Sequence, residues 1–172
     1  KTLLPTYDIF DEYRYFEPAS AWEIVEYKGK RIALTVCEDI WNVGNENPLY
    51  TICPMDELIG QQPDLMLNLS ASPFSFDHAA DRVHVLRANV ELYGLPIFYT
   101  NKVGAQTEVL FDGGSLVMSP DGQVYDELPY FQDAVQTYDL DAVVKSEGIR
   151  GEQPRDKMTL IHDAILMGLQ DY

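Results

Sequence analysis

Cysteine, histidine and positive charge are all scarce in this chain of 172 residues. It has two cysteines, Cys37 and Cys53, and three histidines, and its 12 Lys and Arg stand against 28 Asp and Glu, a formal net charge of −16. Two cysteines are too few for a disulfide framework. The histidines do not have H-x-x-x-H spacing, and the two cysteines do not form a metal-binding pair in the sequence. We therefore expect no metal site.

These shortages also exclude classes of partner. Nucleic acids and anionic membrane surfaces are bound by clustered Lys and Arg, so we expect the chain to bind neither. The sequence contains no apolar run of 18 residues, no signal-like segment and no G-x-x-x-x-G-K-[ST] phosphate loop. With so few cysteines, this pattern favours a reducing, cytoplasmic location.

The residues that are present predict a folded α/β domain. Hydrophobic residues make up 46% of the chain and aromatic residues 12%, enough for a sizeable core. Residues 22–27 and 31–36 are β-rich runs around Lys28-Gly29-Lys30, which indicates a hairpin. The run from Ile32 to Val36 is almost wholly apolar, which is typical of a strand covered on both faces.

Further along, strands alternate with helices. Residues 64–69 and 96–100 are expected to be buried strands on either side of a helix over 77–93, which Gly94 ends. We also expect a helix over 48–59, strands near 115–119, 123–127 and 134–140, a linker over 141–157 marked by Gly148, Gly151 and Pro154, and a final helix from Met158 to Leu169. The alternation predicts a layered α/β fold.

Cys37 is the most conspicuous reactive residue, because it follows a predicted buried strand directly. The carboxyl ends of such strands are where α/β folds bind ligands. Taken alone, a cysteine at this position is more often an inert core thiol than a nucleophile. Cys53 lies among apolar residues and is most simply an inert, packed thiol.

Four ordered motifs resolve this ambiguity. Residues 37–41, C-E-D-I-W, resemble the C-E-D-x-W nucleophile motif of the carbon–nitrogen hydrolase (nitrilase) superfamily, in its glutamine-dependent NAD⁺ synthetase branch. Residues 1–16 are similar to that branch's K-x-x-L-P-x-Y-x-V-F-D-E-x-R-Y-F segment, residues 70–74 to its S-A-S-P-F loop, and residues 109–115 to its V-F-D-G-x-S segment. The resemblance implies an α-β-β-α nitrilase-type sandwich.

The resemblance also implies a chain organisation and a set of partners. Residues 1–140 would be the C-terminal portion of a glutaminase domain whose first strands and helices precede Lys1, and residues 141–172 would lead to a synthetase domain that follows. Residues 166–172 resemble the opening of that domain. There, ammonia would amidate deamido-NAD⁺ with ATP and Mg²⁺, whereas the present residues would hold no cofactor. Family members associate into homo-oligomers, and we expect the same here.

By resemblance, Cys37 attacks the side-chain amide of glutamine and forms a γ-glutamyl thioester, which water hydrolyses. Lys1 matches the lysine that stabilises the oxyanion, helped by the backbone N–H of Glu38, and Glu12 matches an acid that holds this lysine in place. Tyr7, Glu38 and Ser72 match positions around the α-amino and α-carboxylate groups of glutamine.

Two departures accompany these matches. The superfamily uses a Glu–Lys–Cys triad whose general-base glutamate precedes the lysine, so the base would lie upstream of Lys1 and the 172-residue piece would be inactive alone. His78 stands where related sequences often carry a lysine, which weakens any anion-binding role for that position.

Two other functions fit parts of the pattern. One is a stand-alone superfamily amidase acting on another small amide, and the other is an acidic scaffold that kept the fold without the activity. A phosphate-binding S-G-G-x-D-S loop soon after residue 172 would favour the synthetase, and a glutamate upstream of Lys1 would count against the scaffold.

Overall fold

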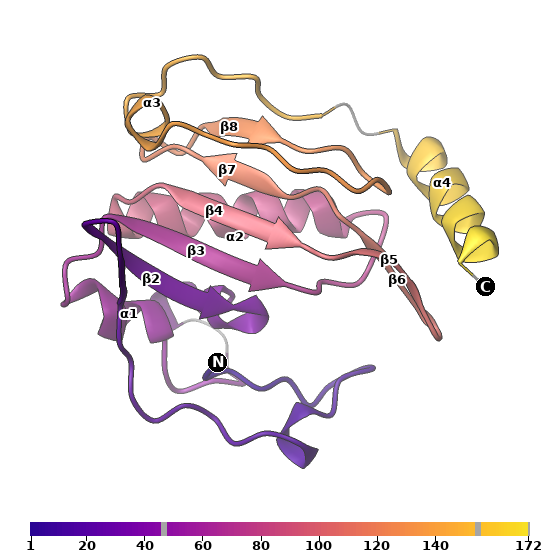
Figure 1. Cartoon of the computed structure of the whole chain (residues 1–172). Coiled ribbons are helices and arrows are strands. Elements are labelled where there is room, and N and C mark those ends of the chain that lie inside the picture. Colours follow the sequence, from indigo (N-terminus) through magenta and orange to yellow (C-terminus); the bar gives the residue numbers. More distant parts are fainter. Residues whose placement is uncertain (46–47, 154–155, 172) are drawn as a thin grey trace.

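A six-stranded sheet organises the computed structural model, which describes residues 1–45, 48–153 and 156–171. The strand order is β1-β2-β3-β4-β7-β8, formed by Val25–Tyr27, Lys30–Val36, Leu65–Ser70, Ile97–Asn101, Leu116–Met118 and Val124–Glu127. Strands β2, β3 and β4 are parallel, and the others join antiparallel (Figure 1). The α/β prediction is confirmed. Pro154, a predicted linker marker, and Tyr172, in the tail motif, lie outside the described residues.

The first hairpin forms as its turn residues predict. Lys28 and Gly29 connect β1 to β2 with φ angles of 48° and 75°. Two consecutive residues with positive φ are the requirement of a type I′ turn, whose twist matches that of the strands. This turn places β1 at the edge of the sheet and β2 inside it, so that Cys37 follows an interior strand.

Helices cover one face of the sheet. Helix α1 spans Pro54–Ile59 and α2 spans His78–Tyr93, and Figure 1 shows α2 running behind the strands. The predicted stripe on α2 is buried at Ala79, Val83, Leu86 and Val90. Gly94 ends the helix with a φ of 68°, as predicted. The core therefore lies between α1, α2 and the sheet.

Two predictions of secondary structure are wrong. The helix expected over 48–59 begins only at Pro54, because the residue before a proline is pushed out of the α region, and Cys53 is extended with φ −108° and ψ 109°. Residues 134–140 form no strand. The sheet edge at β8 is occupied instead at Asp126 by Gly151, while Tyr138 packs against Phe98 on the sheet face.

The segment expected to be a linker is attached to the sheet over much of its length. It begins with α3, Leu140–Val144, whose Val143 is fully buried. Farther along, the backbone N–H of Arg150 donates to the carbonyl of Tyr125 at 2.8 Å. The predicted boundary between a glutaminase domain ending at residue 140 and a linker beginning at residue 141 therefore stays a prediction.

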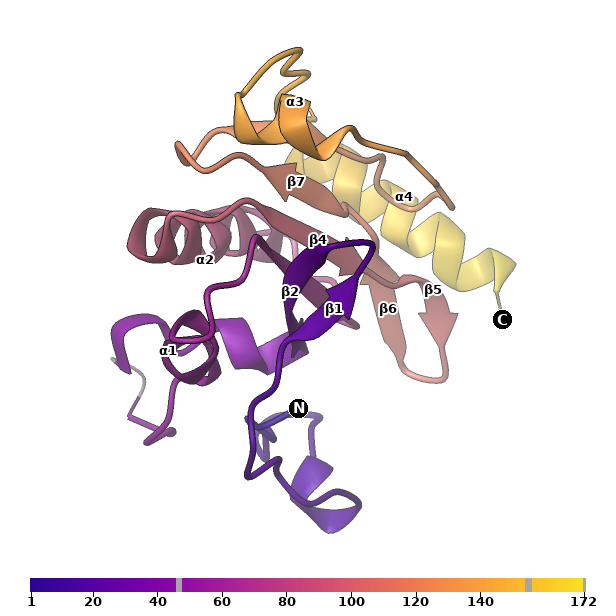
Figure 2. The same ribbon diagram turned by 60° about the vertical axis from the view of Figure 1, so that its left-hand side comes forward.

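A second, two-stranded sheet links the end of β4 to the last helix. Strands β5, Val103–Gln106, and β6, Val109–Asp112, form a hairpin, and α4, Lys157–Gln170, packs beside it (Figures 1 and 2). Asp171 accepts a hydrogen bond from the backbone N–H of Ala105 at 2.7 Å. The final helix is confirmed, and no helix among the described residues is long and apolar enough to cross a membrane.

Candidate active site

Cys37 lies in a tight turn at the carboxyl end of β2. Its φ angle of 50° is in the left-handed region, which non-glycine residues seldom adopt. A 3₁₀-helix, Cys37–Ile40, starts at this residue. The fully buried Asn68 amide lies beneath the turn and donates to the Cys37 carbonyl at 3.4 Å and to Thr35 Oγ1 at 3.0 Å. The next strand therefore supports the turn from below.

Asp39 ties the N-terminal segment to this turn. Its buried carboxylate accepts hydrogen bonds from the backbone N–H groups of Thr2 at 2.9 Å, Leu3 at 2.8 Å and Val36 at 3.0 Å. Three donors satisfy an anion that would otherwise be costly to bury. Asp39 was not predicted as a site residue, although it is the third residue of the C-E-D-x-W motif. Its hydrogen bonds to Thr2 and Leu3 bring Lys1 beside Cys37.

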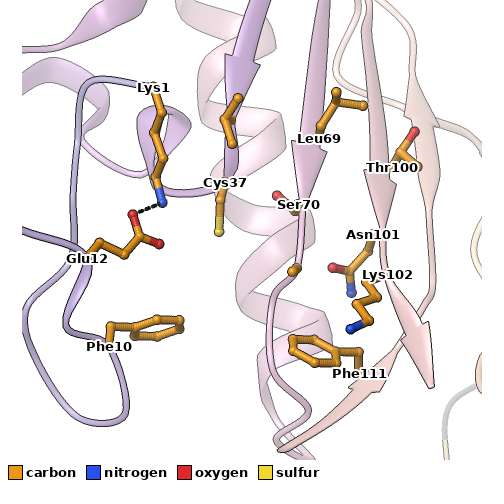
Figure 3. A pocket seen from close by; sticks show the side chains of 12 residues that line it. Lys1, Phe10, Glu12, Cys37, Leu69, Ser70, Thr100, Asn101, Lys102 and Phe111 are labelled. Carbon is orange, nitrogen blue, oxygen red and sulfur yellow. Dashed lines mark hydrogen bonds and ion pairs between the residues drawn. The ribbon is translucent and has the colours of Figure 1, made fainter. Parts of the chain in front are cut away.

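Lys1 and Glu12 form an ion pair at the same place. The ammonium of Lys1 contacts the Glu12 carboxylate, and the two side chains are 16% and 23% exposed. The Glu12 backbone N–H donates to the Pro5 carbonyl at 3.1 Å, which closes the loop between them. Figure 3 shows the ion pair directly beside the Cys37 sulfur. The structure thus brings together the three residues predicted to be catalytic.

The environment of the thiol acts on its pKa in opposing directions. Burial raises the pKa of Cys37, while the Lys1 ammonium, the backbone N–H of Ala71 and the Ser70 hydroxyl each lower it. The negative charge of Glu38 adds a smaller upward effect. Burial has the largest effect, and the Lys1 ammonium has the largest of the effects that favour the thiolate.

A cavity of about 530 Å³ opens in front of the sulfur. It is lined by the ends of three neighbouring strands, the N-terminal loop and β6. The lining residues are Lys1, Phe10, Glu12, Val36, Cys37, Leu69, Ser70, Ala71, Thr100, Asn101, Lys102 and Phe111 (Figure 3). This volume is ample for a small amide, and the Cys37 side chain faces it (Figure 3).

Glu38 is the centre of a separate buried hydrogen-bonded cluster next to Cys37. Its Oε1 accepts the hydroxyl of Tyr7 at 2.7 Å and that of Tyr50 at 2.9 Å. Burial, followed by the interactions with Glu38, raises the pKa of both tyrosines, so both remain neutral donors at physiological pH. Tyr7 and Glu38, both predicted to bind the substrate, are thus hydrogen-bonded to each other, and their substrate-binding role stays a prediction. Tyr50 was missed, because its segment carries no motif.

Ser72 is placed differently from the other predicted residues. It is buried, and its backbone N–H donates to Asn101 Oδ1 at 2.8 Å; the cavity wall is formed instead by Ser70 and Ala71. Asn101 in turn donates to Gly113 at 2.9 Å. The substrate-binding role of Ser72 stays a prediction.

A buried ion pair stands behind this wall. Arg82 on α2 and Asp112 at the end of β6 are 2% and 1% exposed, and the two terminal guanidinium nitrogens donate to the two carboxylate oxygens. In the 109–115 motif, the acidic residue Asp112 therefore makes a structural contact. Among the residues that the structure describes, no group of three or more His, Cys, Asp and Glu is placed to hold a metal ion.

No protein-family model matches the chain, but individual proteins do. It is 35% identical to the glutamine-dependent NAD(+) synthetase of Synechocystis over all of its own length and 32% of that protein. The corresponding enzyme of Thermotoga maritima is 36% identical over 82% of the chain and 23% of that protein. The chain therefore spans about a third or less of the length of these relatives.

Solved structures give the same relationship. The glutamine-dependent NAD⁺ synthetase of Acinetobacter baumannii, in complex with adenosine diphosphate, matches all of this chain and 31% of its own, with a TM-score of 0.85 and 27% identity. An amidase from Nesterenkonia sp. AN1, modified by acrylamide at its active-site cysteine, matches 75% of this chain and 46% of its own, with a TM-score of 0.60 and 25% identity. The sequence and fold matches together show that this chain belongs to the glutamine-dependent NAD⁺ synthetase family, within the nitrilase superfamily.

Proposed function

We propose that this chain carries the glutamine-hydrolysing chemistry of a glutamine-dependent NAD⁺ synthetase, with Cys37 as the nucleophile. The observation that carries the proposal is the meeting of Cys37, Lys1 and Glu12 at one cavity, although they come from separate parts of the sequence. A thiol beside an ammonium group is the arrangement that covalent amide hydrolysis requires.

The reaction follows from this arrangement. The Cys37 thiolate attacks the side-chain carbonyl carbon of glutamine, and the electron pair of the C=O bond moves to the oxygen. The Lys1 ammonium stabilises this oxyanion. The C–N bond then breaks, ammonia leaves with an added proton, and a γ-glutamyl thioester remains. Water attacks the thioester, which releases glutamate and restores the thiol.

Proton transfer needs a base beside the sulfur. Among the described residues of the cavity wall, Glu12 is the carboxylate present, and it is already paired with Lys1. The general-base glutamate expected upstream of Lys1 would fill this role. We therefore expect the 172-residue piece alone to be inactive as a glutaminase, and ammonia release measured beside the natural full-length protein would test this.

The remaining steps would take place outside these residues. Ammonia would amidate deamido-NAD⁺ at a synthetase domain that uses ATP and Mg²⁺, and the adenosine diphosphate bound to the Acinetobacter relative supports a nucleotide site there. We further propose a cytoplasmic homo-oligomer, consistent with the apolar residues Met158, Ile165 and Leu169 exposed on α4.

The decisive test compares the two cysteines in the full-length protein. Cys37→Ala is expected to lower glutamine hydrolysis by roughly 10⁴-fold or more, as loss of a nucleophile does. Cys53→Ala, the matched control, keeps the activity because Cys53 is buried away from the cavity. Undiminished hydrolysis by Cys37→Ala would refute the proposal. Faster turnover of propionamide than of glutamine by the wild type would favour the stand-alone amidase instead.

A further inference from the structure

Lys102 and Phe111 form the cavity wall opposite Lys1 and Cys37 (Figure 3). The backbone at Lys102 is fixed on both sides. Its N–H donates to the carbonyl of Ser70 at 2.9 Å, and its carbonyl accepts the N–H of Gly113 at 3.0 Å. Lys102 is therefore anchored both to the strand end that lines the cavity and to the segment that follows β6.

The charge of Lys102 differs in its surroundings from that of Lys1. Its ammonium lies 4.6 Å from the centroid of the Phe111 ring and donates to the neutral side-chain oxygen of Gln106. Within residues 1–45, 48–153 and 156–171, no carboxylate forms a salt bridge with it, whereas Lys1 is paired with Glu12. The far wall of the cavity thus carries a positive charge that is not paired with a carboxylate among the described residues.

Position 78 does not supply a competing charge to the cavity. His78 Nδ1 lies 3.2 Å from the carbonyl oxygen of Pro73, and its ring is 5.6 Å from that of Trp41. His78 is not part of the wall that surrounds Cys37. Related sequences often carry a lysine at position 78. In this chain the side chain at that position lies outside the cavity wall around Cys37.

The proposed substrate has the charge that Lys102 can bind. Glutamine carries its α-carboxylate at the other end of a short chain from its amide. With the amide carbon at the Cys37 sulfur, that chain extends away from the sulfur into the cavity. An ammonium group binds a carboxylate as a compact point charge through up to three donors.

We infer that Lys102 binds the α-carboxylate of the substrate and makes the site selective for amides that carry this group. This inference rests on the proposed glutamine hydrolysis and adds a specificity residue to it. Lys102 leaves Gln106 and pairs with the carboxylate, while Phe111 continues to support the lysine stem. Because the contact is remote from the reacting carbon, it acts on substrate binding more than on the chemical step.

The experiment uses the full-length protein and two amides. One is L-glutamine, and the other is 4-aminobutanamide, which is glutamine without its carboxylate. For Lys102→Met we expect KM for glutamine to rise about tenfold or more with kcat changed by less than about threefold. Activity on 4-aminobutanamide is expected to fall far less than activity on glutamine. Lys102→Arg keeps most of the glutamine affinity, and Lys145→Met, an exposed control with the same charge loss, behaves as wild type.

Several outcomes would overturn the inference. An unchanged KM for glutamine in Lys102→Met would do so, and so would an equal loss on both amides. Folding is checked by the melting temperature, and the Arg variant preserves the charge if the Met variant fails to fold. If Cys37→Ala is inactive while the Lys102 variants match wild type, this inference fails and the proposed function stands. If Cys37→Ala hydrolyses glutamine normally, the proposed function itself is wrong.

Discussion

Two neighbouring regions of this molecule are held together in different ways. At the carboxyl ends of β2, β3 and β4, polar side chains are buried and hydrogen-bonded, namely Asp39, Asn68, Asn101, Arg82 and Asp112. Between the sheet and its helices, the buried side chains are mostly apolar, among them Met55, Leu58, Val90 and Ile97. Hydrogen bonds impose direction, whereas apolar packing mainly requires volume, so the first region can hold a reacting geometry.

The two cysteines show what this difference means for a thiol. Cys37 is half-buried, has a left-handed backbone and lies beside an ammonium group. Cys53 is 4% exposed, and its sulfur lies 3.2 Å from the hydroxyl of Tyr93. The same side chain is therefore placed for reaction in one region and packed as core in the other.

The largest expected effect comes from breaking the ion pair behind the cavity. Arg82→Met leaves the Asp112 carboxylate buried without its partner, which we expect to destabilise the fold by about 3–5 kcal/mol. Urea denaturation of the variant measures this change. The double variant Arg82→Met/Asp112→Leu is expected to recover part of the loss because no unpaired charge remains. A double variant less stable than Arg82→Met alone would contradict this account.

A somewhat smaller effect is expected at the tether between Lys1 and the nucleophile turn. Asp39→Ala leaves three backbone N–H groups without their acceptor, at a cost of roughly 2–4 kcal/mol, and it frees Lys1 to move away from the sulfur. Both thermal stability and glutamine hydrolysis should fall. Asp64→Ala is the control, since that exposed carboxylate accepts a single backbone hydrogen bond, from Arg31 at 2.7 Å. Equal losses of stability and activity in the two variants would show that the Asp39 hydrogen bonds do not hold Lys1 in place.

The reactivity of the thiol should change more subtly when Lys1 loses its charge. The Lys1 ammonium lowers the pKa of Cys37, so Lys1→Met raises it further and shifts the thiolate to higher pH. We expect slower iodoacetamide alkylation of Cys37 at neutral pH and a rate profile displaced toward alkaline pH. Lys28→Met, at the distant turn between β1 and β2, serves as the control. A profile that does not move would mean that the two groups are uncoupled.

The smallest effect is expected in the apolar core. Cys53→Ala removes one buried sulfur atom, which should cost about 1 kcal/mol of stability through the small cavity that remains. Glutamine hydrolysis should stay at the wild-type rate. Calorimetry and ammonia release give the two values, and a large loss of activity would show that the two regions are not independent.

Local patterns were sufficient where neighbours in sequence decide the structure. The first hairpin follows from the Lys28-Gly29 turn, and α2 follows from its apolar stripe and Gly94. Local patterns failed where distant contacts decide. The β5–β6 hairpin was missed because its connection, with Thr107 at φ 56°, has none of the usual turn pairs. Residues 134–140 looked like a strand, yet the edge strand β8 pairs at Asp126 with Gly151 instead.

The same division applies to the candidate site. Cys37, Lys1 and Glu12 were predicted through motifs, and the structure brings them together. Tyr50, Asn101 and Lys102 were not predicted, because each reaches the site through contacts between distant segments.

By itself, the sequence determined the first hairpin, the strand that ends at Cys37, the helix α2 and the family motifs, because periodicity, turn residues and motif spacing are local properties. Only the tertiary structure decided that the Asp39 carboxylate binds the backbone beside Lys1, and that Lys102, between β4 and β5, lines the cavity. The physical reason is that hydrogen bonds and charges act through space, so the fold selects which distant residues share one cavity.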